Sequence, residues 1–258
     1  MMAVDFQASL FDFAAEPSTT DGAATPCAPS IGFLGDTVRR YVLSSDAWVD
    51  VRPGWVTGSG DLFARLVQNV PWQAERRQMY EQVVDVPRLL KFYAESEPLP
   101  DPVLLDVRTA LNEHYRSELG EDFTSAGMCY YRDGRDSVAW HGDTIGRSKH
   151  EDTMVAIVSF GEARKLLLRP RKGGTVQSGP QGLSPDIPQG LSPNIPPGSS
   201  LGFSLGFSLG FSRGFSLGHG DLLVMGGSCQ RTWEHAVPKT AKPVGPRISI
   251  QFRPHGVR

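Results

Sequence analysis

The sequence predicts an α+β fold that is mainly β, with its helices in the N-terminal half and its strands in the C-terminal half. Two segments, 60–68 and 102–115, carry apolar residues at helical spacing, and the second is typical of an amphipathic helix that packs on a sheet. From Met128 onward the pattern changes to short apolar or alternating runs that are typical of strands. These predicted strands are 128–132, 153–160, 164–169, 221–226, 233–237 and 246–252.

A single folded domain is expected over residues 31–258, since a chain of 258 residues is long enough to build one sizeable core. Residues 1–30 are predicted to form a disordered N-terminal tail, because 12–30 are rich in Ala, Pro, Thr, Ser and Gly. The segment 173–218 is predicted to be a low-complexity loop inserted between two strands of the sheet.

The predicted insertion contains tandem repeats. Residues 180–187 recur almost unchanged as 188–195, and a Ser-Leu-Gly-Phe unit is repeated between Ser200 and Phe211. Pro, Gly and Ser at this density do not readily build a core, and lengthening a loop adds little to its entropy of closure. The alternative is a stacked repeat module, which needs units larger than four residues.

Charge and cysteine content narrow the class of protein. The formal net charge of −2 gives no general basis for nucleic-acid binding, although five cations between Arg164 and Lys172 form a local patch suited to phosphates. The alternative is that these cations line a solvated strand edge. Three widely spaced cysteines without a CxxC pattern favour a reducing, cytoplasmic location. A run of membrane-spanning length and a signal-peptide pattern are both absent, and a monomer is expected.

Two distant segments carry residues that suit a metal ion. In an extended strand side chains alternate, so His141 and Asp143 point the same way, and Gly142 between them adds no bulk. A strand folded alongside supplies His235 as the third ligand. Two histidines and one carboxylate on one face of a metal are the ligand set of non-heme Fe(II) oxygenases. An antiparallel sheet that buries such ligands and is flanked by helices fits a double-stranded β-helix, or jelly roll.

A second HGD sequence, 219–221, is interpreted as a turn that enters the apolar strand 222–225. That strand is expected to neighbour the one that carries His235.

The last predicted strand places two arginines on one face. Alternation puts Arg247, Ser249, Gln251 and Arg253 together, whereas Ile248, Ile250 and Phe252 face a core. The two arginines are about 20 Å apart along a strand, so their long side chains can serve opposite ends of one small pocket. Guanidinium groups bind carboxylates in a bidentate manner, which favours a dicarboxylate as the ligand.

These motifs resemble the AlkB family of Fe(II)/2-oxoglutarate-dependent dioxygenases, which repair alkylated nucleic acid bases. The matching stretches are 131–143, 158–161, 219–227, 233–238 and 246–253, and the resemblance covers about residues 50–172 and 217–253. It implies a jelly roll in which His141, Asp143 and His235 bind Fe(II), with 2-oxoglutarate and O2 as co-substrates.

The resemblance also implies roles around the metal. Arg247 matches the residue that binds the distal carboxylate of 2-oxoglutarate, Tyr131 assists it, and Arg253 matches the arginine near the metal-proximal carboxylate. Ser249 lies on the same strand face and is included among the co-substrate residues. Cys129 stands where relatives often carry Asn, and 144–147 lack the acidic residues that often follow the metal motif.

The implied activity is oxidative dealkylation of bases in single-stranded or flipped-base DNA, with RNA as an alternative substrate. Residues 72–93 fall where the family's nucleotide-recognition lid lies, and arginines interleaved with aromatics suit phosphate contact and stacking. An amphipathic surface helix is the other interpretation of this segment. The candidate substrate-binding residues are Arg76, Arg77, Tyr80, Arg88, Tyr93, Trp140, Arg147, Arg164 and Lys165. The rival function is a small-molecule or protein hydroxylase on the same scaffold.

The N-terminal segment Gln7–Phe11 resembles the short peptide by which bacterial repair and replication proteins bind the sliding clamp. Leu10 and Phe11 would fill an apolar pocket while Gln7 hydrogen-bonds its rim, although Ala8 stands where Leu is preferred. The alternative is that this apolar segment packs on its own domain.

Overall fold

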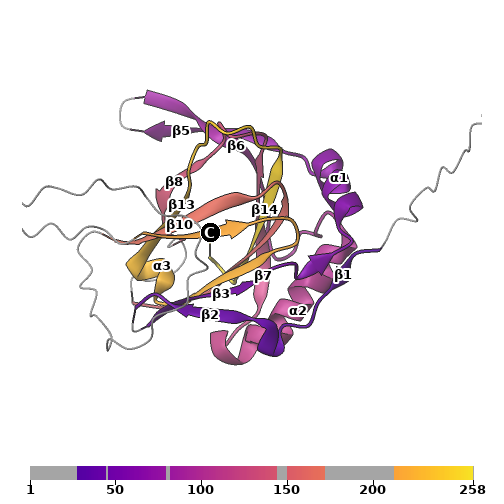
Figure 1. Ribbon diagram of the computed structural model, residues 1–258, viewed down its shortest axis with the longest axis vertical. Coiled ribbons are helices and arrows are strands. Elements are labelled where there is room, and N and C mark those ends of the chain that lie inside the picture. The colour runs from indigo at the N-terminus through magenta and orange to yellow at the C-terminus, as the bar shows by residue number, and fades with distance from the viewer. Residues whose placement is uncertain (1–27, 45, 80–81, 144–149, 172–211, 258) are drawn as a thin grey trace, which may run out of the picture.

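The computed structural model describes residues 28–44, 46–79, 82–143, 150–171 and 212–257, with the backbone alone for 77–79 and 82–84 (Figure 1). The peptide Gln7–Phe11 and residues 172–211 therefore lie outside the described part of the chain.

The helices are α1 (Gly60–Asn69), α2 (Pro102–Leu119), α3 (Cys229–Thr232) and the 3-10 turn η1 (Gly35–Thr37). The N-terminal strands are β1 (Ser30–Ile31), β2 (Arg39–Val42), β3 (Ala47–Arg52), β4 (Val56–Thr57), β5 (Gln73–Met79), β6 (Gln82–Tyr93) and β7 (Phe123–Tyr131). The later strands are β8 (Val138–His141), β9 (Val155–Gly161), β10 (Arg164–Pro170), β11 (Arg213–Leu217), β12 (Leu222–Gly227), β13 (Trp233–Val237) and β14 (Arg247–Pro254).

Two antiparallel sheets form the body of the molecule, as expected of a jelly roll. The large sheet has the order β2-β3-β12-β9-β14-β7-β6-β5, and the small sheet has the order β11-β10-β13-β8. Helices α1 and α2 cover the outer face of the large sheet (Figure 1). One apolar core lies between these helices and the large sheet, and a second core contains side chains from both sheets. The predicted mainly β fold with flanking N-terminal helices is thus confirmed.

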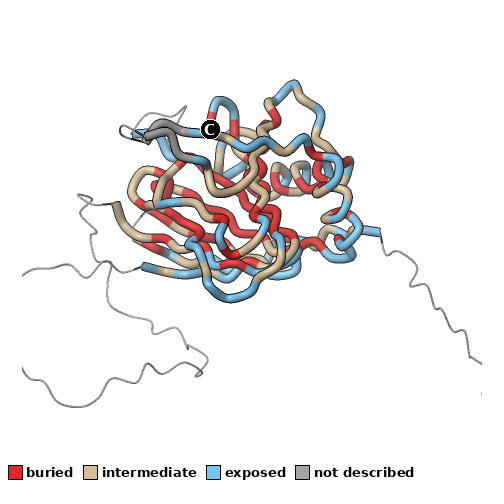
Figure 2. The backbone as a smooth tube through the Cα atoms, turned by 90° about the horizontal axis from the view of Figure 1, so that it is seen from above, coloured by how far each residue is buried: buried red, intermediate tan, exposed pale blue. Residues whose placement is uncertain are grey.

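The central strands of the large sheet are buried on both faces, which explains their sequence. In β9 and β12 almost every residue is buried, since helices cover one face and the small sheet covers the other. Figure 2 shows the buried backbone gathered in the middle of the molecule and the exposed backbone around its edges. Strands in this position carry continuous apolar runs instead of an alternating pattern. Within the described residues, no helix combines the length and the apolar character needed to cross a membrane.

Helix α2 begins and ends at residues suited to those positions. The Asp101 side chain accepts a hydrogen bond from Val103 N, Pro102 occupies the first helical turn, and Gly120 ends the helix with φ of 81°. Its buried face packs on the large sheet through Leu104, Val107, Leu111 and Tyr115. The amphipathic helix predicted over 102–115 is therefore confirmed, and it extends to residue 119.

Segment 72–93 is a β-hairpin, so its interpretation as a surface helix was wrong. Strands β5 and β6 pair with each other at the edge of the large sheet. The pairing shifts register between Ala74 and Arg76, opposite the stretch that contains Pro87. A proline lacks the N–H that a ladder needs, and such an irregularity is where a strand accommodates one.

Two further expectations about neighbouring strands need correction. The insertion predicted over 173–218 is shorter at its C-terminal end, because Arg213–Leu217 form β11 and pair with β10. Phe215 in this strand packs against Tyr41 with ring centroids 5.4 Å apart, a contact between distant segments that the repeat pattern conceals. The turn 219–221 does enter strand β12, but β12 lies in the large sheet between β3 and β9, whereas β13 belongs to the small sheet.

Candidate metal centre and its cavities

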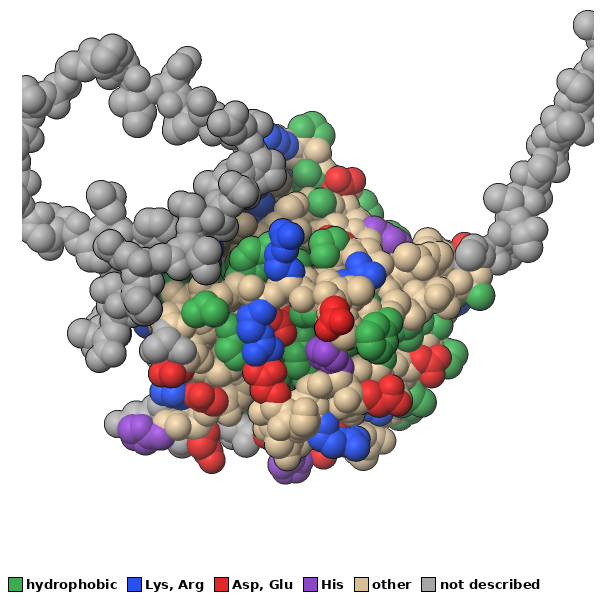
Figure 3. All heavy atoms as spheres, turned by 60° about the horizontal axis from the view of Figure 1, so that its bottom comes forward, with side chains coloured by type: hydrophobic (Ala, Val, Ile, Leu, Met, Phe, Trp, Pro, Cys, Tyr) green, Lys and Arg blue, Asp and Glu red, His purple; other side chains and the backbone are tan. Residues whose placement is uncertain are grey.

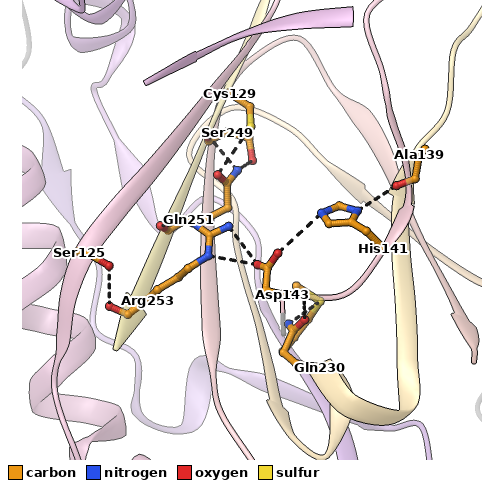
Figure 4. A network of polar contacts seen from close by, with 10 residues as sticks. Ser125, Cys129, Ala139, His141, Asp143, Gln230, Ser249, Gln251 and Arg253 are labelled. Carbon is orange, nitrogen blue, oxygen red and sulfur yellow. Dashed lines mark hydrogen bonds and ion pairs between the residues drawn. The ribbon is translucent and has the colours of Figure 1, made fainter. Parts of the chain in front are cut away.

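The three predicted ligands come together at the paired strands β8 and β13. His141 is directly opposite His235 in this pairing, and Asp143 follows the end of β8. One donor atom from each of the three side chains lies within 4.8 Å of the other two. Figure 4 shows Asp143 between His141 and Arg253, with His141 Nε2 3.7 Å from Asp143 Oδ1. The geometry therefore presents two imidazoles and one carboxylate to a common point.

The surroundings favour the protonation states that bind a metal. His141 Nδ1 is 2.9 Å from Ala139 O, a contact in which Nδ1–H donates and Nε2 is left free for a metal. Burial and the neighbouring His141 lower the pKa of His235 to about 3, so its imidazole is neutral. Burial alone would raise the pKa of Asp143, but Arg253 and the two histidines outweigh it and lower the value to about 2. The site thus holds a neutral His235 imidazole and an ionised Asp143 carboxylate.

Helix α3 holds the backbone of the carboxylate ligand. Asp143 N donates to Gln230 Oε1 at 3.0 Å, and Gln230 is only 1% exposed. A Cβ at Gly142 would lie 2.3 Å from Arg171 Nη2 and 2.8 Å from Gln230 O, so only glycine fits there. Sequence reasoning recognised that Gly142 adds no bulk but missed Gln230, which is 87 residues from Asp143 and belongs to no motif.

Strand β14 places its polar face in a cavity beside the metal ligands. Ile248, Ile250 and Phe252 are buried in the helix-side core, and the alternate residues point to the small sheet, as the sequence predicts. The cavity has about 460 Å³ of empty space, part of which is open to solvent. It is lined by Arg88, Cys129, Tyr131, Val138, His141, Ile157, Leu166, His235, Val237, Arg247, Ser249, Gln251 and Arg253.

Arg247 is a buried cation at the inner end of this cavity, and no carboxylate among the described residues pairs with it. Its side chain is 1% exposed, and Nη2 donates to Ser159 Oγ at 2.6 Å, whereas Nε and Nη1 have no hydrogen-bond partner in the part of the chain that the structure describes. Tyr131 lies under the guanidinium, with 5.3 Å from Cζ to the ring centroid. Burial lowers the pKa of Arg247, although Tyr131 opposes this shift. An unpaired buried charge is costly, so the cavity is built to receive an anion.

Arg253 lies at the other end of the strand face, next to the metal ligands. Its Nη2 and Nε donate to Asp143 Oδ2 at 3.0 and 3.2 Å (Figure 4). Gly127 on the neighbouring strand β7 makes room for this side chain, since a Cβ there would lie 2.4 Å from Arg253 Nη1. The two arginines therefore flank one cavity at opposite ends, an arrangement that suits a small dicarboxylate.

Residues 57–253 match the family model described as the 2OG-Fe(II) oxygenase superfamily. The chain belongs to this superfamily. It is similar to the alpha-ketoglutarate-dependent dioxygenase alkB homolog 3 of Bos taurus, at 28% identity over 217 residues that cover 78% of this chain and 64% of the bovine protein. The Homo sapiens protein of the same name is 28% identical over 235 residues, or 85% of this chain and 68% of that protein.

The DNA oxidative demethylase ALKBH2 of Arabidopsis thaliana is 32% identical over 147 residues, which cover 57% of this chain and 42% of the plant protein. The resemblance to the AlkB family is therefore confirmed. The oxygenase chain spans just under two thirds of the bovine relative, 64%, and a smaller part of the plant one.

A second, larger groove opens beside the metal ligands of this oxygenase. It has about 1340 Å³ of empty space between the β5–β6 hairpin and the small sheet. Its lining is mostly apolar: Asp85, Val86, Pro87, Arg88, Ser137, Val138, Ala139, Trp140, His141, Leu167, Ala236, Val237, Pro238 and Lys239. The groove shares His141 and Arg88 with the smaller cavity, so a molecule in the groove can reach the metal centre.

Two of the predicted substrate residues, Arg88 and Trp140, line this groove. Arg88 Nη1 donates to Ser137 O at 3.0 Å, and its buried Nε has no hydrogen-bond partner among the residues that the structure describes. The Arg169 guanidinium lies 4.2 Å from the centroid of the Trp140 ring, and its Nε donates to Glu234 Oε2 at 2.9 Å. The indole is thus held in place at the edge of the groove.

Other predicted substrate residues are positioned differently. Arg164 is buried and donates to the carbonyl oxygens of Asp133, Asp136 and Pro238, so its role is structural and its assignment to substrate was wrong. Tyr93 is buried in the core between the helices and the large sheet, so it does not line the groove either. Arg76 is paired with Asp85 at 2.8 Å, and Lys165 is exposed on β10.

The side chains of the other three predicted substrate residues, Arg77, Tyr80 and Arg147, lie outside the described part of the chain. Basic side chains are interspersed with acidic ones on the face shown in Figure 3 and form no single patch there. Among the described residues, cations such as Arg132 and Arg231 are paired with carboxylates, those of Asp136 and Asp152.

Proposed function

We propose that this oxygenase removes alkyl groups from nucleic acid bases by oxidation, with Fe(II) as its metal and 2-oxoglutarate and O2 as co-substrates. The observation that carries the proposal is the Arg247 guanidinium, whose Nε and Nη1 have no partner among the described residues and which faces a cavity that also contains the two histidine ligands. An anion at Arg247 that extends toward Arg253 and the ligands has the shape of a small dicarboxylate. The names of the AlkB homologues and of the plant DNA oxidative demethylase support the substrate class.

The residues fit the iron and the co-substrate. His141, His235 and Asp143 would hold the metal, and two histidines with one carboxylate leave open positions for other ligands. Arg247 and Tyr131 would hold the distal carboxylate, and Ser249 lines the cavity between the two arginines. The chemistry that this centre supplies when loaded is activation of O2 coupled to oxidation of 2-oxoglutarate to succinate and CO2.

The protein's own part is to orient the reactants and to exclude water. Arg253 keeps the Asp143 carboxylate ionised and fixed, and the Ala139 carbonyl holds the His141 ring by its Nδ1–H. The apolar groove wall next to His141 would place an N-alkyl carbon beside the centre while the rest of the base lies against Trp140. A hydroxylated N-alkyl group then releases an aldehyde and leaves the repaired base.

Single-stranded or flipped-base DNA is the proposed substrate, because a base must leave the stack to enter the groove. Lys239 and Arg88 line this groove and supply the cations nearest to the base, while the exposed Lys165 lies on β10. Phosphate contacts of this kind make binding weaken steeply with salt.

The test measures succinate release and loss of the alkyl group from oligonucleotides that carry methyl or etheno bases, in DNA and RNA. The expected result is repair that requires Fe(II) and 2-oxoglutarate, and that is abolished by His141→Ala. Binding to DNA measured from 50 to 300 mM salt should weaken by about tenfold or more. A flat salt response with no repair of any base would favour a small-molecule or protein hydroxylase instead.

A second proposal concerns recruitment in the cytoplasm through the segment Gln7–Phe11. Its pattern resembles that of a clamp-binding peptide, and recruitment through it would raise the local concentration of the enzyme at replication sites without altering turnover. A peptide of residues 1–15 should bind a bacterial sliding clamp, and Leu10→Ala with Phe11→Ala should abolish that binding. Equal binding by both peptides would reject this proposal.

A further inference from the structure

We infer that Cys129 is a covalent-modification site for small anionic electrophiles, placed so that its modification closes the co-substrate cavity. The inference rests on the proposed function only for its consequence, the loss of 2-oxoglutarate binding. The reactivity itself depends on the position of the thiol.

The thiol lies in the wall of the cavity between the two arginines. Cys129 is on β7, directly opposite Ser249 of β14, and both residues line the cavity. The side chain is partly accessible, and its Sγ lies 3.7 Å from Gln251 Oε1 (Figure 4). Gln251 is anchored in turn, since its Nε2 donates to Ser249 Oγ at 2.7 Å. The sulfur therefore faces the space that a dicarboxylate would fill.

An independent feature of the same cavity points to an anionic ligand. Within the described part of the chain, Arg247 is buried there with Nε and Nη1 unpartnered, and Arg88 adds a buried Nε that also has no partner. Cations that line a cavity concentrate anions in it. A reagent that carries a carboxylate should therefore collect beside Cys129, whereas a neutral reagent of the same size gains nothing from the arginines.

Iodoacetate is a suitable probe, and the reaction is a simple displacement. The Cys129 thiol first loses its proton to solvent. The resulting thiolate attacks the CH2 carbon, the C–S bond forms, the C–I bond breaks, and iodide leaves. The new carboxymethyl group keeps its carboxylate among the arginines. It would occupy the volume that 2-oxoglutarate needs.

Cys229 provides an internal control within the same chain. It is 2% exposed in the core between the sheets, and burial raises the pKa of its thiol to about 12. A thiol in that state is inert toward alkylation. Cys27 lies outside the described residues and is replaced by alanine for the experiment.

The experiment follows alkylation of the full-length Cys27→Ala protein by mass spectrometry of its peptides, with iodoacetate and iodoacetamide in parallel. The expected result is one carboxymethyl group, located on Cys129. The ratio of the iodoacetate rate to the iodoacetamide rate should be about tenfold or more above the ratio for free cysteine. Saturating 2-oxoglutarate should slow the reaction at Cys129, and succinate should slow it less.

A second measurement separates this inference from the proposed function. Binding of 2-oxoglutarate by calorimetry should be lost in proportion to carboxymethylation. Failure to label Cys129, equal rate ratios for the protein and free cysteine, or labelling that 2-oxoglutarate does not slow would each overturn the inference. If labelling and protection behave as expected but the unmodified protein repairs no alkylated base, the modification site stands and the proposed substrate fails.

Discussion

The Gln230 side chain should control metal affinity although it does not touch the metal. Replacing Gln230 with methionine keeps the length of the side chain but removes the oxygen that accepts from Asp143 N at 3.0 Å. Both groups are buried, and an unpaired buried donor costs about 1–3 kcal/mol, equivalent to about 5- to 150-fold in an equilibrium constant. Loss of a group that orients a metal ligand typically weakens metal binding by about 10- to 100-fold.

The assay is calorimetric titration of the metal-free protein with Mn(II), which binds such a site without oxidative turnover. Gln230→Met should raise the Kd by about tenfold or more, while Gln230→Glu, which retains an acceptor oxygen at the same length, should bind Mn(II) more tightly than Gln230→Met. The matched control is Gln73→Met on the exposed edge strand β5, for which the Kd should not change. An unaltered Kd in Gln230→Met would refute the argument that this amide positions Asp143.

Three other perturbations have defined outcomes. Arg247→Met should weaken 2-oxoglutarate binding by about 30-fold or more in calorimetry and leave Mn(II) binding within a few-fold, because it removes an anion partner at the end of the cavity that is far from the metal. An equal loss of 2-oxoglutarate and Mn(II) binding would contradict the placement of Arg247 at that end. His219, whose pKa is lowered by burial against an opposing effect of Asp221, accepts from Gly161 N at Nδ1 and contacts Ser59 Oγ through Nε2. The neutral form of His219 is favoured in the folded state, so its contribution to the free energy of unfolding should be complete above about pH 6.5 and should fall as the pH drops below that value. His219→Ala should therefore flatten the change in melting temperature between pH 7 and 5. An unchanged slope in the variant would contradict this prediction. Replacing residues 172–211 with a short Gly-Ser turn should keep turnover within a few-fold, because β10 and β11 pair on either side of the segment; a large loss would show that the segment acts on substrate.

The parts of the fold and site that the sequence predicted well depend on local periodicity. Alternation along 247–253 placed Arg247 and Arg253 on one face, and the HxD spacing placed His141 and Asp143 on one side. The side-chain faces predicted from these patterns are the ones found in the folded protein, because the position of a residue along a strand alone decides which face its side chain is on. The structure agrees with both.

The errors arise where a residue's role depends on a distant partner. Arg164 looked like part of a phosphate-binding patch, yet three backbone carbonyls, among them Pro238 O, bind it inside the protein. Strand β11 was hidden in a repeat because its pairing with β10 depends on a segment about 50 residues upstream, at Leu166↔Phe215. Gln230 had no local signal at all, since its partner is the backbone of Asp143.

The pairing of His141 with His235 gives the metal a mechanical role in addition to a chemical one. A divalent ion held by both residues ties together two strands whose ligands are 94 positions apart in the chain, in the same way as a crosslink. Because only the folded chain can bind the ion with all three ligands, a free ion concentration of a hundred times the Kd would add about 2.7 kcal/mol to the free energy of unfolding. Removal of the metal by a chelator would then destabilise the small sheet first, and the melting temperature of the oxygenase should fall as the fraction of protein with bound iron falls.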